Sequence, residues 1–248
     1  IIINNIPVGS TGKGSLVFDA GGGTGRWACN LSQIYKKTRF IVYDLSVDML
    51  NKANLNIKNI NAESRITVIH GDLTKMDNIK TEYVDHIVSI YSPISFIYKK
   101  HEAFKEMYRI LKPGGSIIIM GHGFYNALYS KIQNYHAHPK ELDALDEKKL
   151  VKWTDYVPKL NVFSQEIMEA ELLSVGFSDC KSYGVPVFVQ PEDEDFDPSN
   201  TKKSRISRAL ENEQFFQKIL ELEMKYNSIK SVVNRGVNIF TLARKFTK

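Results

Sequence analysis

A run of glycines near the start of the chain has the composition of a ligand-binding loop. It reads Asp19-Ala20-Gly21-Gly22-Gly23-Thr24-Gly25 and follows the apolar stretch Ser15 to Ala20. Glycine adopts positive φ angles without strain and lets a ligand approach the backbone closely. The run lies where a predicted strand passes into a predicted helix, a position at which nucleotide-like ligands commonly bind. We therefore predict a nucleotide-like ligand at this loop.

Two common nucleotide-binding motifs do not fit this part of the chain. The dinucleotide pattern Gly-x-Gly-x-x-Gly, begun at Gly21, needs a third glycine where Arg26 stands. A P-loop needs Ser or Thr directly after its Gly-Lys pair, but Gly14 follows Gly12-Lys13, and that segment precedes the strand instead of following it. The mismatches argue against both a dinucleotide and a P-loop ligand.

Candidate catalytic residues follow the fifth predicted strand, in the run Gly121-His122-Gly123-Phe124-Tyr125. His122 titrates near neutral pH, so it can act as a general base, or it can be a loop histidine bonded to the backbone. Tyr125, with Tyr91 and Tyr129, can line an aromatic pocket for a substrate or pack in the interior. We take His122 and Tyr125 as the catalytic candidates.

Metal ligands and disulfides are not predicted. His136 and His138 have the spacing His-x-His but no further ligand nearby, and Cys29 and Cys180 lie far apart without metal-ligand spacing. The acidic run at residues 192–195 has the character of a solvated turn. We expect no metal site.

The charge and hydropathy of the chain limit the kinds of partner that we expect. The net charge is +5 and the isoelectric point is about 9.0. Lys and Arg are nevertheless spread along the chain, and where lysines are adjacent they form no more than pairs, whereas nucleic-acid binding needs a clustered patch. No stretch approaches the ~20 apolar residues that span a bilayer, and Ile1-Ile2-Ile3 is too short for a signal-peptide core. We predict a cytoplasmic protein with no membrane span, and nucleic acid is not the favoured partner.

The elements that position these residues follow an α/β pattern. Alternating β-branched runs and helical patterns over residues 15–121 are typical of a parallel sheet with crossover helices. The predicted strands are 15–20, 40–44, 66–70, 86–91 and 116–120, and the helices are 25–36, 46–59 and a segment around 104–111. Further along we predict two helices in 122–162, a helix over 164–176, strand-like residues over 177–190 that are broken by Pro186, a long helix over 204–228 and a last strand over 237–243.

Taken in order, these segments resemble the class I S-adenosylmethionine-dependent methyltransferases, in particular the quinone-biosynthesis and small-molecule branch. The resemblance rests on Asp-x-Gly-x-Gly-x-Gly at 19–25, Ile41-Val42-Tyr43-Asp44-Leu45-Ser46, Ile69-His70-Gly71-Asp72-Leu73, the fourth strand at 84–89, and Leu111-Lys112-Pro113-Gly114-Gly115. It implies one domain over residues 1–248 with a Rossmann-like, doubly wound, mostly parallel seven-stranded sheet whose last strand is antiparallel. Helical insertions after strands five and six would occupy 122–162 and 191–232.

The same resemblance implies a set of cofactor contacts. Asp19 would help to hold the ammonium end of S-adenosylmethionine, and Asp44 would accept hydrogen bonds from both ribose hydroxyls. Leu45 and Met49 would flank the adenine, and Asp72 would accept from its amine. The remaining implied contacts are Gly21, Gly23, Gly25, Leu73 and Ile90.

The expected reaction is transfer of a methyl group by in-line displacement to a small molecule, which requires mainly positioning and electrostatics. The run Tyr91-Ser92-Pro93-Ile94 lacks the second proline and the aromatic residue that nucleobase amino-methyltransferases carry after strand four. Two alternatives stay open: methylation of RNA or protein, and a non-catalytic protein that binds S-adenosylmethionine. We also predict that the two insertions form a lid over the acceptor site.

Overall fold

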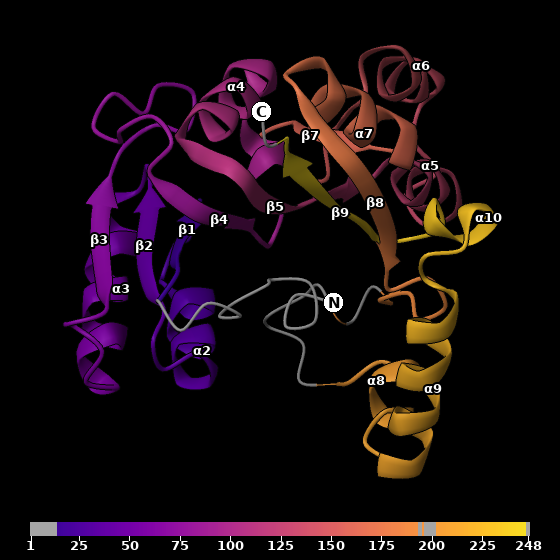
Figure 1. Ribbon diagram of the computed structural model, residues 1–248. Helices are drawn as coiled ribbons and strands as arrows, with labels where there is room; N and C mark the ends of the chain where they lie inside the picture. Colours follow the sequence, from indigo (N-terminus) through magenta and orange to yellow (C-terminus); the bar gives the residue numbers. More distant parts are fainter. Residues whose placement is uncertain (1–13, 193–194, 196–201, 247–248) are drawn as a thin grey trace.

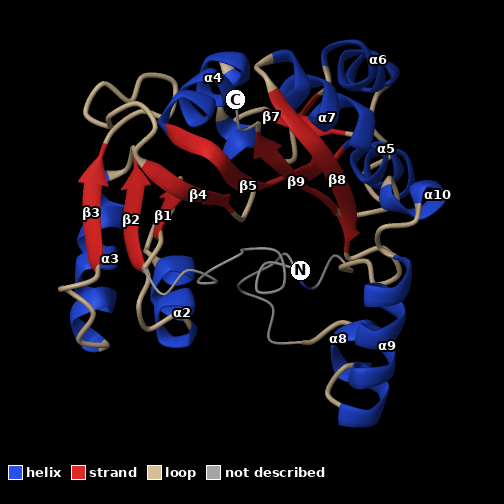
Figure 2. Cartoon of the chain, in the orientation of Figure 1, coloured by secondary structure: helices blue, strands red, loops and turns tan. Residues whose placement is uncertain are grey.

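A computed structural model describes residues 14–192, 195 and 202–246, and it shows an α/β protein built on one central sheet (Figures 1 and 2). The strands are β1 Leu16–Ala20, β2 Arg39–Asp44, β3 Ile66–His70, β4 Val84–Ser89, β5 Leu111–Gly123, β6 Leu150–Val151, β7 Leu160–Phe163, β8 Phe177–Val185 and β9 Asn238–Lys245. The helices are α2 Arg26–Ile34, α3 Val47–Asn59, η1 Pro93–Phe96, α4 Lys100–Ile110, α5 Phe124–Gln133, α6 Pro139–Lys148, α7 Gln165–Ser174, α8 Arg205–Ala209, α9 Glu213–Tyr226 and α10 Lys230–Val233.

The predicted Rossmann-like sheet is confirmed in its strand order and directions. β3, β2, β1, β4 and β5 lie side by side and parallel, and β9 pairs antiparallel with β5 and with β8. Parallel strands place their carboxyl ends at one edge of the sheet, where open α/β sheets bind ligands. The glycine loop, Asp44 and Asp72 all follow such strand ends.

Within the described residues the sheet has nine strands rather than the seven predicted. The two additional strands, β6 and β7, form an antiparallel hairpin within the first insertion. β4 ends where Ser89 pairs with Ile119, so the last residues of β5 extend beyond it, and β7 pairs with them through His122 and Gly123. His122 is therefore part of a strand and not of the loop that follows one.

Helices cover both faces of the sheet. α2 and α3 contribute apolar residues to the core on one face, whereas α4 and α7 pack on the other face, as Figure 2 also shows. The fully buried Phe18 and Tyr43 stack at 5.2 Å between their ring centroids. Burying side chains of this size stabilises the fold by roughly 1.5–3 kcal/mol each. The first insertion has a smaller apolar cluster of its own, built around Phe124, Leu145 and Val162.

The long helix predicted over 204–228 is wrong, because the chain forms two helices there. Residues 210–212 separate α8 from α9, and the Asn212 side chain accepts a hydrogen bond from the Phe215 N–H at 3.0 Å. Asparagine favours such N-cap positions because its side chain satisfies a free backbone N–H. Of the acidic run at 192–195, Glu192 and Asp195 are described and accept hydrogen bonds from α8, Glu192 from the Arg205 N–H at 3.0 Å and Asp195 from the Ser207 hydroxyl at 2.7 Å. The two residues between them lie outside the described residues.

Candidate functional site

The glycine loop between β1 and α2 has a conformation that other residues adopt only with strain. Gly21, Gly23 and Gly25 have φ angles of 68°, 51° and 70°, a region that costs other residues roughly 1–2 kcal/mol. The N–H groups of Gly21 and Gly22 both donate to the Tyr43 carbonyl, at 2.8 and 3.1 Å. The loop is therefore fixed against the end of β2.

Asp44 connects this loop to the start of α3. Its Oδ2 accepts a hydrogen bond from the Gly23 N–H and its Oδ1 accepts one from the Ser46 N–H, each at 2.8 Å. Ser46 in turn caps α3 by accepting from the Met49 N–H at 3.3 Å. The Asp44 carboxylate is thus held in one orientation while it remains half-buried at a cavity.

A cavity of about 450 Å³ lies at the carboxyl ends of β1 to β4 and brings most of the predicted cofactor contacts together. The predicted residues that line it are Gly21, Gly23, Asp44, Leu45, Met49, Asp72, Leu73 and Ile90. The lining also includes Ser46, Gly71, Tyr91, Pro93, Phe96 and Ile97. A cavity of this size suits a ligand as large as a nucleoside derivative.

The apolar residues of the cavity are unusually exposed for their size. Leu45 is 66% exposed, Tyr91 58%, Phe96 49% and Met49 48%. Large apolar side chains that gather in a concave site favour binding of a flat, largely apolar group, because its binding removes their surface from water. The carboxylates of Asp44 and Asp72 lie in the same lining and offer acceptors for polar hydrogens at the edges of such a group.

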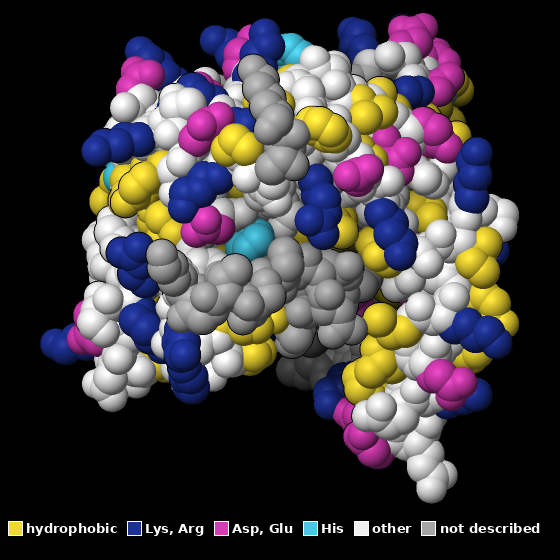
Figure 3. Space-filling model, in the orientation of Figure 1, with side chains coloured by type: hydrophobic (Ala, Val, Ile, Leu, Met, Phe, Trp, Pro, Cys, Tyr) yellow, Lys and Arg dark blue, Asp and Glu magenta, His cyan; other side chains and the backbone are white. Residues whose placement is uncertain are grey.

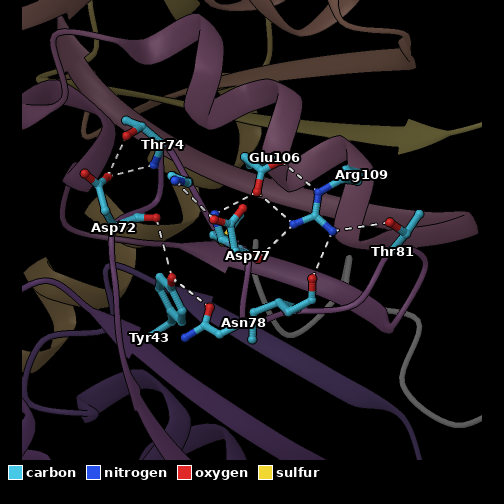
Figure 4. Close-up of polar contacts among 11 residues, drawn as sticks. Tyr43, Asp72, Thr74, Asp77, Asn78, Thr81, Glu106 and Arg109 are labelled. Carbon is cyan, nitrogen blue, oxygen red and sulfur yellow. Dashed lines mark hydrogen bonds and ion pairs between the residues drawn. The ribbon is translucent and has the colours of Figure 1, made fainter.

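Asp72 is positioned by its neighbours after β3 (Figure 4). Its Oδ1 accepts hydrogen bonds from the N–H and the hydroxyl of Thr74, at 2.8 and 2.9 Å. The Tyr43 hydroxyl lies 3.2 Å from Asn78 Oδ1 and 3.5 Å from the Asp72 carbonyl oxygen. These contacts hold the Asp72 backbone beside the end of β2.

An ion pair on α4 fixes the segment that follows Asp72. The guanidinium of Arg109 lies 2.7 Å from Glu106 and also donates to the carbonyls of Met76 and Ile79, each at 2.9 Å (Figure 4). Glu106 accepts from the Met76 N–H at 2.7 Å. The hydrogen bond from Arg109 lowers the pKa of Glu106, so the pair stays charged and the loop keeps its shape.

Asp19 and Gly25 do not line the cavity. Asp19 is buried under the glycine loop, and its Oδ2 accepts a hydrogen bond from the Ala28 N–H at 3.3 Å. Burial raises the pKa of Asp19 to about 7, and the charge of Asp44 acts in the same direction. Gly25 is the N-cap of α2, where an added Cβ would lie 3.3 Å from the Ala53 Cβ. Asp19 and Gly25 therefore stabilise the glycine loop on the side away from the cavity.

The segment after β4 has a strained backbone. Tyr91 and Ser92 have φ angles of 70° and 60°, and non-glycine residues in this region are often found at functional sites. The Tyr91 hydroxyl accepts a hydrogen bond from Arg26 at 3.0 Å, and its ring lies 6.2 Å from that of Trp27. Tyr91 therefore links the end of β4 to the first turn of α2.

His122 lines neither this cavity nor the one that contains Tyr125. Its N–H donates to Ser95 Oγ at 3.0 Å, and it pairs across the sheet with Asn238. Burial lowers the pKa of the His122 imidazole, while its hydrogen bond with the Asn238 side chain acts in the opposite direction. The lowered pKa favours the neutral ring, which is the form that can accept a proton.

Tyr125 lies in a second cavity, of about 580 Å³, between α5 and α10. Its ring packs edge-on against Phe124 with 5.0 Å between the centroids. α5 belongs to the first insertion and α10 to the end of the second, so the two predicted insertions meet here. By contrast, α9 has no buried residue and extends away from the sheet (Figure 1).

The lysines that are dispersed along the sequence are partly gathered by the fold. On the face drawn in Figure 3, Lys and Arg side chains are separated by neutral and apolar surface. A third cavity, of about 590 Å³ beside α6, is nevertheless lined by several lysines: Lys131, Lys140, Lys148, Lys152 and Lys159. Two of these cations are paired, Lys131 with Glu141 at 3.4 Å and Lys152 with Asp155 at 2.7 Å.

The described residues form neither a metal site nor a membrane-spanning helix. In the described ranges, no three His, Cys, Asp or Glu side chains are arranged to hold a metal ion. No helix in that part of the chain is long and apolar enough to cross a bilayer.

Sequence reasoning missed the part of the cavity wall that follows β4. Pro93, Phe96 and Ile97 lie in or just after η1, a short 3₁₀ helix without a recognisable motif. The available indication was topological, because the loop after the fourth strand must lie at the carboxyl edge of the sheet. Which of its side chains face the cavity depends on the left-handed turn at Tyr91 and Ser92.

Comparison with known proteins places this geometry in a family. Residues 17–115 match the methyltransferase domain family, and these residues contain β1 to β4 and the whole glycine loop. A ubiquinone/menaquinone biosynthesis C-methyltransferase of Haemophilus ducreyi is 26% identical over 109 residues, which are 44% of this chain and 41% of that protein. The chain thus spans about two fifths of the length of that relative.

Other similarities extend over nearly the whole chain. The malonyl-[acyl-carrier protein] O-methyltransferase of Priestia megaterium is 24% identical over 234 residues, 94% of this chain and 75% of that protein. Phosphoethanolamine N-methyltransferase 2 of Haemonchus contortus, solved with S-adenosyl-L-methionine, has a TM-score of 0.61 at 15% identity over 99% of this chain and 51% of that one. The [4+2]-cyclase SpnF has a TM-score of 0.55 at 14% identity, over 95% of this chain and 77% of that one.

The two solved structures share the fold, and the cyclase shows that this fold does not determine the reaction. The similarity that bears on function is the sequence match across residues 17–115, which also build the site. Residues 17–115 of the chain, about two fifths of its length, form a domain that matches the methyltransferase domain family.

Proposed function

We propose that this chain transfers a methyl group from S-adenosylmethionine to a small-molecule acceptor by in-line displacement. The observation that carries the proposal is the cavity in which the Asp44 carboxylate lies between the glycine loop and the exposed side chains of Leu45 and Met49. This combination offers an acceptor for ribose hydroxyls next to an apolar surface for adenine. Asp72, beyond Leu45, would accept a hydrogen bond from the adenine amine.

The shape of the glycine loop fits such a ligand. A Cβ added at Gly23 would have Asp44 Oδ2, at 4.0 Å, as its nearest neighbour, so the space in front of this glycine is open. Gly23 therefore presents bare backbone to the cavity, as close approach of a ligand requires. When bound, the cofactor supplies an activated methyl carbon on a sulfonium, and the protein's contribution is to position the acceptor and exclude water.

Different residues of this chain would position the cofactor, accept a proton and contact the acceptor. Asp44 and Asp72 would orient the nucleoside. His122 lines neither cavity, so it would take a proton from an acceptor that loses one on methylation only through an intervening water. Asp19, buried under the loop, would favour a cationic ligand through its charge. Tyr125 would contact the acceptor from the first insertion. A small acceptor agrees with the similarity to a ubiquinone/menaquinone biosynthesis C-methyltransferase and to a phosphoethanolamine N-methyltransferase.

The lid is part of this proposal. α5, from the first insertion, and α10, from the second, already form one cavity wall each. α9 carries the exposed side chains of Phe215, Phe216, Leu220 and Met224 on the same insertion. Closing this apolar helix over a bound acceptor would exclude water from the transfer step.

We expect the chain to bind S-adenosylmethionine and S-adenosylhomocysteine in preference to NAD. Arg26 stands where the dinucleotide pattern has the glycine that lets the helix pack closely on the strand, so this loop departs from that pattern. Isothermal titration calorimetry with all three ligands tests this. Binding of NAD without binding of either methionine nucleoside would reject the assignment.

Replacing Asp44 with alanine should weaken S-adenosylhomocysteine binding by about 1.5–3 kcal/mol, the range for hydrogen bonds to a charged group. The variant loses the ribose acceptor and also the anchor of the Gly23 N–H. Asp72→Ala removes the same charge but only one proposed ligand contact, so its loss should be smaller. Calorimetry on both variants, with circular dichroism to confirm folding, provides the comparison. A dissociation constant unchanged by Asp44→Ala would show that the nucleoside binds elsewhere.

The activity itself is tested by release of S-adenosylhomocysteine from a fractionated metabolite extract. Turnover with a small-molecule fraction supports the proposal, whereas turnover only with RNA or protein fractions favours the alternative methyltransferases. Tight cofactor binding without turnover on any fraction favours a protein that binds the cofactor without using it.

A further inference from the structure

The cavity between α5 and α10 differs from the cofactor cavity in its chemistry. Tyr125 and Tyr129, 50% and 55% exposed, come from α5, and Lys230 and Arg235 come from α10 and the turn after it. The cavity is about 580 Å³, large enough for a small metabolite. It thus combines aromatic faces, hydroxyls and two cations.

This cavity lies at the same edge of the sheet as the cofactor cavity. The Gly123 N–H, at the end of β5, donates to the Val237 carbonyl at 2.9 Å, directly before β9 begins. Tyr91 of the cofactor cavity contacts the sulfur of Met120 through its N–H at 3.3 Å. From Met120 to Tyr125 the chain can extend at most roughly 17 Å. One elongated small molecule can therefore contact both cavities.

Hydrogen bonds join the walls of the cavity. The Asn126 side chain donates to Gln190 Oε1 at 2.6 Å, and Gln190 donates to the Arg235 carbonyl at 3.4 Å. On the other side, Asn234 accepts from the Gln165 N–H at 2.8 Å and donates to Glu166 at 3.1 Å. The segments that carry the two cations are therefore held in place, which reduces the entropy lost on binding.

The charges in this cavity are unbalanced. Among the described residues that line it there is no Asp or Glu. Lys230 and Arg235 form no ion pair within the described part of the chain. Glu166, beside the cavity, accepts hydrogen bonds from Asn234, and the charge of Lys230 contributes to lowering its pKa. Lys230 is therefore partly balanced by Glu166, whereas Arg235 has no acidic partner among the described residues. Two cations with nearby hydroxyls and amides, and only one carboxylate near them, form a binding site for a carboxylate or a phosphate monoester.

We propose that the cavity between α5 and α10 binds the anionic group, a carboxylate or a phosphate monoester, of the small molecule that the enzyme methylates. The proposal rests on the proposed methyl transfer and adds the chemical class of the acceptor. Tyr125 and Tyr129 would contact the acceptor's body, while Lys230 and Arg235 fix its anionic end. The nucleophilic atom would then lie toward Tyr91 and the cofactor.

The first test measures binding of inorganic phosphate to the full chain by phosphorus NMR. The double variant Lys230→Gln/Arg235→Gln should raise the dissociation constant of phosphate about tenfold or more. The control Lys52→Gln/Lys58→Gln changes the net charge equally on α3, away from both cavities, and should leave phosphate binding within about twofold of the wild type. If Lys230→Gln/Arg235→Gln binds phosphate as tightly as the wild type, the proposal is wrong, and the lysine cavity beside α6 becomes the alternative phosphate site.

The second test uses a metabolite extract separated by anion exchange into anionic and non-anionic fractions. Release of S-adenosylhomocysteine should occur with the anionic fraction, and Lys230→Gln/Arg235→Gln should raise KM with little change in cofactor affinity. Turnover confined to non-anionic fractions would overturn the proposal. The two proposals can fail separately. If the chain binds no S-adenosylhomocysteine but the double variant still loses phosphate binding, the proposed methyl transfer is rejected and the proposed anion site remains.

Discussion

Replacing Asp19 with asparagine should stabilise the cofactor-free protein above pH 7 and leave its stability near pH 4 unchanged. Asp19 is 1% exposed, and burial raises its pKa from 3.8 to about 7. Between these values the unfolded chain has lost this proton while the folded chain keeps it. The folded state therefore binds more protons, and its stability falls as the pH rises from about 4 to about 7.

The size of the effect follows from the two pKa values. Their difference corresponds to a loss of up to about 4 kcal/mol once the pH exceeds 7. Asparagine can still accept the hydrogen bond from the Ala28 N–H without ever becoming charged. The variant should therefore gain stability relative to the wild type progressively between pH 4 and pH 8.

Urea unfolding of both proteins at several pH values measures this difference. Burial lowers the pKa values of His86 and His122, which gives stability a dependence of the opposite sign near pH 6. Both proteins share that contribution, so it cancels when their unfolding free energies are subtracted. Parallel stability curves for wild type and Asp19→Asn across this range would show that Asp19 is ionised in the folded protein.

The same substitution tests how Asp19 contributes to ligand binding. If a cationic ligand binds above the glycine loop, the ionised Asp19 attracts it, so affinity in the wild type should increase as the pH rises through about 7. Asp19→Asn should remove that increase. A pH dependence that persists in the variant would assign it to another group.

The parallel half of the fold could be predicted because its signals are local. β1, β2, β3 and β4 are short apolar runs bounded by turn residues, and their order follows from the resemblance of residues 15–121 to one family. The predicted start of the helix at residue 46 is also local, because serine is a residue type favoured at helix N-caps and the Ser46 side chain accepts from the Met49 N–H. Asp44 and Asp72 could be placed at one edge because parallel strands end there together.

The remainder depends on contacts between distant segments. The extension of β5 through His122 depends on pairing with Asn238 and Val162, and nothing near His122 in the sequence indicates either partner. The break between α8 and α9 depends on one asparagine cap at Asn212, within a segment whose apolar spacing is helical throughout. Local propensity did not distinguish one helix from two.

The second cavity could not be predicted from the sequence either. Tyr125 and Arg235 are separated by more than a hundred residues, and only the pairing of β5 with β9 brings their segments together. The same reason explains the lysine cavity beside α6, where Lys131 and Lys159 approach one another only in the fold. A list of charges along a chain does not show which of them converge.

Substituting alanine at Gly21 and at Gly23 should separate the stability of the glycine loop from its binding function. Both residues have positive φ angles, 68° and 51°, so each substitution costs roughly 1–2 kcal/mol of backbone strain. At Gly21 the new Cβ would also lie 2.4 Å from the Pro93 Cβ. Such overlap in a packed region adds roughly 1–3 kcal/mol, so Gly21→Ala should lose about 3 kcal/mol of unfolding free energy.

Gly23→Ala should behave differently because its added methyl group points into open space, 4.0 Å from Asp44 Oδ2. Its stability should fall only by the backbone strain, whereas the methyl group would occupy the position of the proposed ligand. We expect Gly23→Ala to weaken S-adenosylhomocysteine binding more than tenfold while the protein remains folded at 25 °C. Urea unfolding and calorimetry on both variants give the two quantities. Equal losses of stability would mean that Pro93 yields to the new side chain, and unchanged binding by Gly23→Ala would remove the ligand from the glycine loop.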